Sequence, residues 1–182
     1  MEVLVVIDMQ KDFIDGSLGT KEAQLILPKI IKRVEKSKKE LILFTYDTHQ
    51  ENYLDTLEGK KLPIVHCIEG SEGWEFDKDI INAWKNNEDT ILLDEIEKHY
   101  FYKPVFGSME LVKFLKKHAV EITKVELIGV CTDICVVSNA IMIKNEIPDL
   151  ELFVAADLCA GVTLESHEAA LKVLAMCQVN IT

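Results

Sequence analysis

A strand, a tight turn and a helix follow one another directly around residues 124–145, and this order constrains the fold more than any other stretch. Lys124–Ile128 predicts a short buried strand. Gly129 opens a tight turn that ends at Thr132, the expected N-cap of the next helix. Apolar residues then recur at helical spacing to about Asn145. The stretch therefore predicts one strand-turn-helix unit.

The same alternation runs through the rest of the chain. Further strands are predicted at Val3–Ile7, Leu41–Thr45, Thr90–Leu93 and Leu150–Val154. Helices are predicted at Gln24–Lys36, Phe76–Trp84, Met109–His118 and Leu164–Cys177. Residues 46–75 have little periodicity and predict a long functional loop. This order predicts a single domain over residues 1–182, of the α/β class, with a three-layer, Rossmann-like parallel sheet.

Composition excludes several classes of partner. The formal net charge of −11 argues against nucleic acid and against anionic membranes. No apolar run approaches the length of a membrane span. The five cysteines, an odd number without paired spacings, indicate reduced thiols rather than a disulfide framework. The chain also opens on an apolar run without a basic leader. We therefore expect a cytoplasmic protein.

Chemically capable side chains follow four of the predicted strands. In chain order they are Asp8, then Asp47 and His49, then Cys131 and Cys135, and last Asp157. In open parallel sheets, ligands bind beyond the carboxyl ends of the strands. The sequence therefore predicts a site at this rim of the sheet.

A cysteine nucleophile is one interpretation of this set. Cys135 falls in the first helical turn, where unpaired N–H groups and the helix dipole favour a thiolate. Asp8 could accept the thiol proton, and Lys103 could stabilise both a thiolate and an oxyanion. The alternatives are structural: Cys131 and Cys135 as small buried residues, Asp8 as a turn residue and Lys103 as a solvated lysine.

A metal site is the second interpretation. Asp47 and His49 lie on the same side of an extended segment, and Glu58 and His66 follow in the same loop. Two histidines and two carboxylates suit zinc, iron or manganese. The alternative is ordinary loop polarity, with His66 packed beside Cys67.

Together, these motifs resemble the cysteine amidohydrolases of the nicotinamidase and isochorismatase superfamily, and within it the nicotinamidases. The resemblance covers essentially the whole chain. It rests on residues 6–13, 16–18, 46–49, 63–73, 103–106, 129–136 and 156–161. The block at 129–136, combined with Asp8, is its most specific part.

The resemblance implies an isochorismatase-like fold and a catalytic triad of Asp8, Lys103 and Cys135. It also implies a cis peptide bond between Val130 and Cys131, which would aim the backbone N–H groups of Cys131 and Cys135 at an oxyanion. The lysine segment is shorter than is usual in the family, so Lys98 is a second candidate for the lysine.

The resemblance further implies a divalent metal ion (zinc, iron or manganese) held by Asp47, His49 and His66. Glu58 resembles a further ligand of some members, and Asp55 competes with it for that place.

Two substrate-binding positions also follow from the resemblance. Phe13 matches a ring-stacking residue. Leu62 stands where nicotinamidases usually carry a tryptophan.

The implied reaction is hydrolysis of a small amide such as nicotinamide through a thioester, in an enzyme that we expect to be a homo-oligomer. Two alternatives remain open at this point. One is a metal-free isochorismatase-type hydrolase, or another hydrolase acting on carbamoyl or ureido compounds. The other is a thiol-redox or binding protein that uses Cys131 and Cys135.

Overall fold

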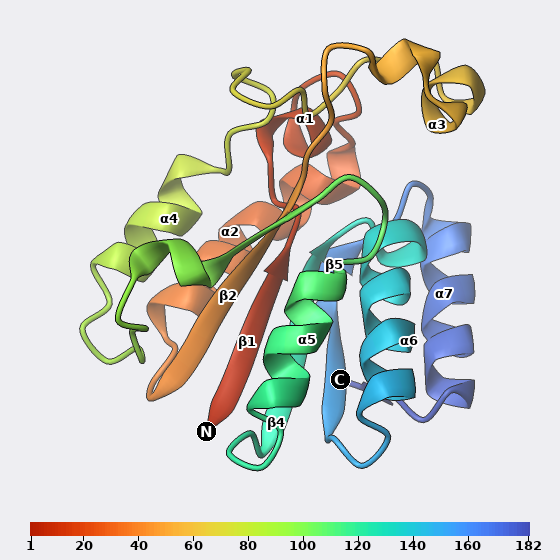
Figure 1. The fold of residues 1–182 in the computed structure, drawn as a ribbon. Helices are drawn as coiled ribbons and strands as arrows, with labels where there is room; N and C mark the ends of the chain where they lie inside the picture. Colours follow the sequence, from red (N-terminus) through yellow and green to blue (C-terminus); the bar gives the residue numbers. More distant parts are fainter.

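A six-stranded parallel sheet forms the centre of the protein in the computed structural model, which describes residues 1–182 except the side chain of Ile96. Across the sheet the strand order is β3-β2-β1-β4-β5-β6. The strands are β1 (Glu2–Ile7), β2 (Glu40–Asp47), β3 (Tyr100–Lys103), β4 (Lys124–Val130), β5 (Leu152–Ala160) and β6 (Asn180–Ile181). Helices cover both faces of this sheet (Figure 1), so the predicted three-layer α/β fold is confirmed.

The helices divide between the two faces because side chains alternate along each strand. Val3, Val5 and Ile7 pack on the face of α5, α6 and α7, whereas Leu4 and Val6 pack on the face of α2 and α4. The bounds are α2 (Lys21–Glu35), α4 (Lys78–Lys85), α5 (Met109–Lys117), α6 (Val137–Glu146) and α7 (Leu164–Met176). Among the described helices, none combines the length and the apolar character needed to cross a bilayer.

Two short helices lie beyond the carboxyl ends of the strands (Figure 1). They are α1 (Lys11–Ile14) and α3 (Leu57–Lys61). The segment at 46–75, predicted as a loop, contains α3 and a 3-10 turn at Tyr53–Asp55. This segment therefore crosses over the rim of the sheet where the site was predicted.

The third strand was predicted in the wrong place. Within Thr90–Leu93, Ile91 makes only an isolated bridge to Leu41, at the beginning of β2. The second half of β2, Phe44–Asp47, pairs instead with Tyr100–Lys103. Both segments lie along the same edge of β2, one after the other, and only the second forms a continuous strand pairing.

The fifth strand is longer than predicted, which removes Asp157 from the site. The strand was expected to end at Val154, with Asp157 beyond it. In the structure β5 continues to Ala160, so Asp157 lies within the strand with an exposed side chain. Its backbone oxygen accepts a hydrogen bond from Lys29 Nζ at 3.3 Å.

Candidate active site

Three strand ends bring Asp8, Lys103 and Cys135 together. Asp8 follows β1, Lys103 ends β3, and Cys135 lies in the turn after β4. All three are buried, with 0%, 1% and 5% of their surface exposed. Lys103 Nζ lies 2.7 Å from Asp8 Oδ2 and 3.5 Å from Cys135 Sγ. Lys98, the other candidate lysine, pairs instead with Glu95 at the surface, at 3.3 Å.

Burial dominates the electrostatics of this cluster. It raises the pKa of Asp8 above its ordinary value, although the Lys103 charge opposes the shift. It also raises the pKa of the Cys135 thiol well above its ordinary value; Lys103 lowers that pKa, and a hydrogen bond to Asp8 adds to the rise. Burial disfavours charged Lys103 as well, but the surrounding groups, Asp8 first among them and then Cys135 and Asp47, together outweigh this and raise the lysine pKa.

The position at a helix N-terminus therefore does not lower the pKa of Cys135 as expected from the sequence. The helix terminus and the ammonium favour the thiolate, but the loss of hydration on burial is larger. The raised pKa values favour a protonated thiol beside a carboxyl group that binds a proton more readily than an ordinary aspartate. This arrangement suits transfer of the proton to Asp8 during the reaction.

The turn that carries Cys135 differs in detail from the prediction. Thr132–Val136 forms a π-helical turn ahead of α6, and Cys131, not Thr132, is its N-cap. The Thr132 hydroxyl lies 2.8 Å from His167 Nδ1 on α7 instead. The peptide bond between Val130 and Cys131 is cis, as the resemblance implied. At Gly129, where φ is +118°, a Cβ would lie 2.1 Å from the Ile7 oxygen, so only glycine fits.

Two further residues hold this cluster in place, and neither was identified from the sequence. Thr45 Oγ1 donates to Asp8 Oδ1 at 2.6 Å. Asn139 Nδ2 donates to the Cys135 oxygen at 2.8 Å, while Asn139 Oδ1 accepts from the Ser108 N–H at 2.9 Å. Asn139 thereby ties the loop after Lys103 to the turn of the nucleophile. A polar residue four positions after Cys135 on a buried helix face is the signal that could have found it.

Asp47, His49 and His66 form a buried cluster that could hold a metal ion. One ligand atom from each lies within 4.8 Å of the others. His49 Nε2 and His66 Nε2 lie 3.0 Å and 3.5 Å from Asp47 Oδ2. His66 Nδ1 lies 2.8 Å from the Ile64 oxygen, and a donor bond there leaves Nε2 free as a ligand. His49 Nε2 is buried without a hydrogen-bond partner among the described residues. These observations fit a divalent cation.

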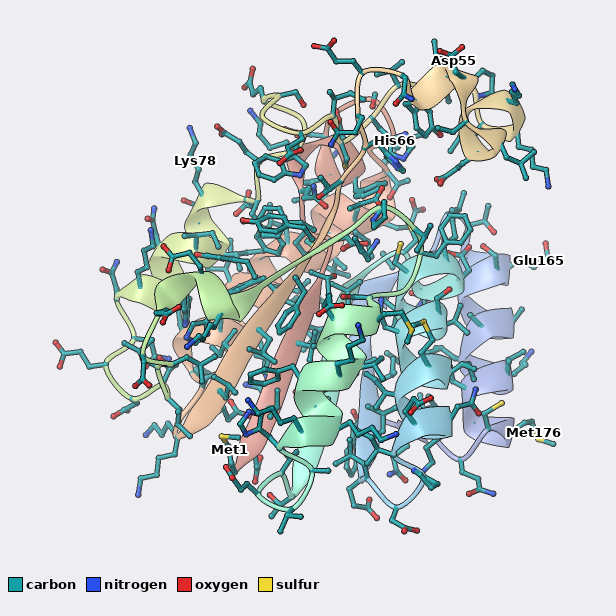
Figure 2. The ribbon with its side chains drawn as sticks, in the orientation of Figure 1. Met1, Asp55, His66, Lys78, Glu165 and Met176 are labelled. Carbon is teal, nitrogen blue, oxygen red and sulfur yellow. The ribbon has the colours of Figure 1, made fainter. Side chains whose placement is uncertain are left out.

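Of the two carboxylates considered as a further ligand, the structure brings only Glu58 near this cluster. Glu58 Oε1 lies 3.8 Å from His49 Nε2, and its side chain is 24% exposed. Asp55 is exposed and lies on the outer surface of the segment before α3, away from His66 (Figure 2). The α3 turn thus directs Glu58 inward and leaves Asp55 outside.

Lys103 connects the two clusters. Its Nζ lies 3.2 Å from Asp47 Oδ1, in addition to its contact with Asp8. Burial would raise the pKa of Asp47, but the adjacent imidazoles of His49 and His66 and the charge of Lys103 together hold it well below its usual range. Gln10 fixes the Asp47 backbone, because its Oε1 accepts from the Asp47 N–H at 2.7 Å.

A cavity of about 740 Å³ opens beside these clusters. His49 and Glu58 line it, and so does Leu62, one of the two predicted substrate-binding residues. Phe13 does not line it. Phe13 is buried and packs edge-on against His66, with ring centroids 5.6 Å apart. The role of Phe13 in binding a substrate ring stays a prediction.

Comparison with known proteins agrees with this fold and site. The model of the isochorismatase domain matches residues 2–182. The uncharacterized isochorismatase family protein PncA of Bacillus subtilis (strain 168) is 26% identical over 176 residues, which cover 94% of this chain and 92% of that protein.

Two solved structures are similar over the full length. The pyrazinamidase/nicotinamidase of Streptococcus mutans UA159 has a TM-score of 0.80 and 26% identity, with 100% of both chains covered. The pyrazinamidase of Pyrococcus horikoshii, in complex with zinc, has a TM-score of 0.78 and 26% identity, with 100% of this chain and 98% of that chain covered. With a family model that matches from the second residue to the last, this chain belongs to the isochorismatase family.

Proposed function

We propose that this amide-hydrolysing enzyme converts a small primary amide, such as nicotinamide, into the carboxylic acid and ammonia through a thioester on Cys135. One observation carries the proposal: the Lys103 ammonium lies 2.7 Å from the Asp8 carboxylate and 3.5 Å from the Cys135 sulfur. The similarity to a pyrazinamidase/nicotinamidase and to a pyrazinamidase supports the same reaction type.

The first half of the reaction forms the thioester. Asp8 takes the thiol proton, and the sulfur of Cys135 attacks the amide carbonyl carbon. The backbone N–H groups of Cys131 and Cys135, with the Lys103 ammonium, stabilise the oxyanion that develops. Asp8 then gives its proton to the leaving nitrogen as the C–N bond breaks and ammonia departs.

The second half releases the acid. Asp8, now a carboxylate again, takes a proton from water as the water oxygen attacks the thioester carbon. The C–S bond breaks, and the proton on Asp8 returns to the Cys135 sulfur. Lys103 stays within reach of both groups throughout, because β3 holds it 2.7 Å from Asp8.

Asp47, His49 and His66, with Glu58 beside them, would hold a divalent zinc, iron or manganese ion. Such an ion acts as a template that orients a polar atom of the substrate. The zinc in the similar Pyrococcus horikoshii protein supports this assignment. The proton transfers above need only Asp8, Lys103 and Cys135.

The reaction is tested by ammonia release from nicotinamide, pyrazinamide, and carbamoyl and ureido amides. We expect turnover of the first two and loss of turnover in Cys135→Ala. Release from the carbamoyl or ureido compounds alone would favour an isochorismatase-type or other hydrolase of a different substrate.

The metal is tested by elemental analysis of the purified protein, with about one divalent ion expected per chain. His66→Ala should lose the ion while Cys135 can still be alkylated. Glu58→Ala should bind the ion more weakly than the wild type, and Asp55→Ala is the matched control. A metal-free protein that keeps full activity in a chelator would contradict the metal assignment and leave the thiol chemistry standing.

A further inference from the structure

We propose that the preferred substrate is a primary amide whose acyl group is uncharged, apolar and larger than a single pyridine ring. This inference rests on the proposed amide hydrolysis and concerns the part of the substrate that does not react. It is carried by the size, the lining and the position of the cavity beside the catalytic cluster.

The size of the cavity exceeds what nicotinamide needs. A molecule of about nine non-hydrogen atoms fills at most roughly 270 Å³, at about 30 Å³ for each water-sized group. The cavity measures about 740 Å³, within the range of roughly 300–1,000 Å³ that holds larger organic ligands. Nicotinamide would leave most of this space to water.

The walls of the cavity are mostly apolar and come from three segments. They are Leu57 and Leu62 from the α3 segment, Val105 and Phe106 from the loop after Lys103, and Ile134 from the turn before Cys135. Leu57, Val105 and Phe106 leave 71%, 55% and 47% of their surface exposed. Contact with an apolar acyl group would remove this surface from water, which favours binding.

The apolar walls disfavour an anionic acyl group. The two carboxylates of the lining already have partners: Glu58 faces His49 at 3.8 Å, and Asp133 accepts the Val162 N–H at 3.1 Å. Placing a substrate carboxylate against the apolar side chains would remove its hydration, which costs free energy.

Asp8, Lys103 and Cys135 do not line the cavity themselves, but it lies next to them. His49 Nε2 lies 3.0 Å from Asp47 Oδ2, and Asp47 Oδ1 lies 3.2 Å from Lys103 Nζ. His49, from the candidate metal cluster, lines the same space. An amide carbonyl placed at Cys135 would thus extend its acyl group between the α3 segment and the loop after Lys103.

The inference is tested with a series of amides: nicotinamide, benzamide, phenylacetamide, 3-phenylpropanamide and 4-phenylbutanamide. We expect kcat/KM to rise by up to about fourfold for each added methylene, the factor that corresponds to burying one such group. Succinamic acid, a small amide with a carboxylate, should be a poorer substrate than butanamide. The highest kcat/KM of the series for nicotinamide, or a higher kcat/KM for succinamic acid than for butanamide, would overturn this inference and leave the proposed function standing. Hydrolysis of no amide would overturn the proposed function and this inference together.

A variant that narrows the cavity distinguishes a specific effect on large substrates from a general loss of activity. In Leu62→Trp, the ratio of kcat/KM for 4-phenylbutanamide to that for nicotinamide should fall at least tenfold. Leu25→Trp is the control, because Leu25 is 70% exposed on α2, outside this cavity, and the ratio should stay at the wild-type value. An unchanged ratio in Leu62→Trp would overturn the inference, whatever happens to the two rates separately.

Discussion

Both ends of the central sheet bury one cation against two carboxylates, yet the two clusters are built differently. At the amino ends of the strands, Arg33 on α2 contacts Glu40 of β2 and Glu126 of β4, at 2.7 Å and 2.8 Å. At the carboxyl ends, Lys103 contacts Asp8 and Asp47, at 2.7 Å and 3.2 Å. A second, more exposed cation, Lys124, also reaches Glu126 at 3.4 Å, so the carboxylates at the amino end face two cations.

The two clusters differ in how many of the cation's N–H donors have a hydrogen-bond acceptor of their own. The guanidinium of Arg33 donates to both oxygens of Glu40 and also to Glu126 and Ser37, so its planar fork is used in full. Lys103 shares one ammonium among two carboxylates and a thiol, almost without exposure to water. The Arg33 cluster is therefore suited to holding α2, β2 and β4 together. The Lys103 cluster shares its cation and includes a thiol proton that can be transferred, so it is suited to catalysis.

The largest expected effect concerns the thiol, which the amino-end cluster lacks. Cys135→Ala should abolish turnover, because it removes the sulfur that forms the thioester. Cys131→Ala should largely keep turnover, since only its backbone has an assigned role. Ammonia release and the folded circular dichroism spectrum of each variant are the measurements. Equal loss in both variants would point to a redox dithiol instead.

The second effect concerns the lysine at the carboxyl end. Lys103→Ala should reduce the rate ~100-fold or more, the usual result of removing one electrostatic stabiliser. Lys98→Ala should change it little, because Lys98 pairs with Glu95 at the surface. Steady-state kinetics of both variants make the comparison. Small and similar losses would mean that neither lysine acts in catalysis.

The third effect concerns the arginine at the amino end. Arg33→Met should lower the free energy of unfolding by up to about 3 kcal/mol, because it leaves the partly buried Glu40 without its cation and Glu126 with Lys124 alone. The value of kcat should stay at the wild-type level, since Arg33 lies at the other end of the sheet. Urea unfolding and kinetics on the same preparation check both statements. A large loss of kcat with unchanged stability would reverse the roles assigned to the two clusters.

The smallest effect is the pH dependence of the amino-end cluster. Burial would raise the pKa of Glu40, but the hydrogen bonds and the charge of Arg33, with smaller contributions from Ser37 and Lys124, together outweigh it, so the folded pKa lies below the ordinary 4.5. A lowered folded pKa gives stability that is present above the unfolded pKa and lost as the pH falls through the folded one. The stability advantage of the wild type over Glu40→Gln should therefore be constant near neutral pH and shrink below about pH 4.5. Urea unfolding at several pH values measures this difference, and an advantage that grows on acidification would contradict it.

The sheet and its rim could be predicted because both depend on local pattern. Apolar runs mark β1 and β2, and the strand-turn-helix order around Gly129 marks β4; parallel geometry then requires Asp8 and Cys135 to meet at one edge. The choice between Thr90–Leu93 and Tyr100–Lys103 as the third strand was not local. It depends on which segment pairs with the second half of β2. That pairing is a tertiary contact, which cannot be predicted from the strand propensities of the two segments.

The burial of the catalytic cluster also could not be predicted from the sequence. A helix N-terminus can be recognised from residues, but the 5% exposure of Cys135 results from packing of the whole domain and reverses the direction of its pKa shift. Glu58 and Asp55 lie three residues apart in an aperiodic segment. Only the formation of α3 decides which carboxylate turns toward His49.

The strand that carries Lys103 has a consequence for how the enzyme fails on warming. β3 is four residues long and pairs only with β2, from Tyr100 against Phe44 to Lys103 against Asp47. Short segments at the edge of a sheet open at a lower free energy than the domain unfolds. Each such opening withdraws the ammonium from its partners while the other strands remain paired. Activity should thus decline reversibly before the fold melts, with the fraying of one edge strand as the upper thermal limit of catalysis.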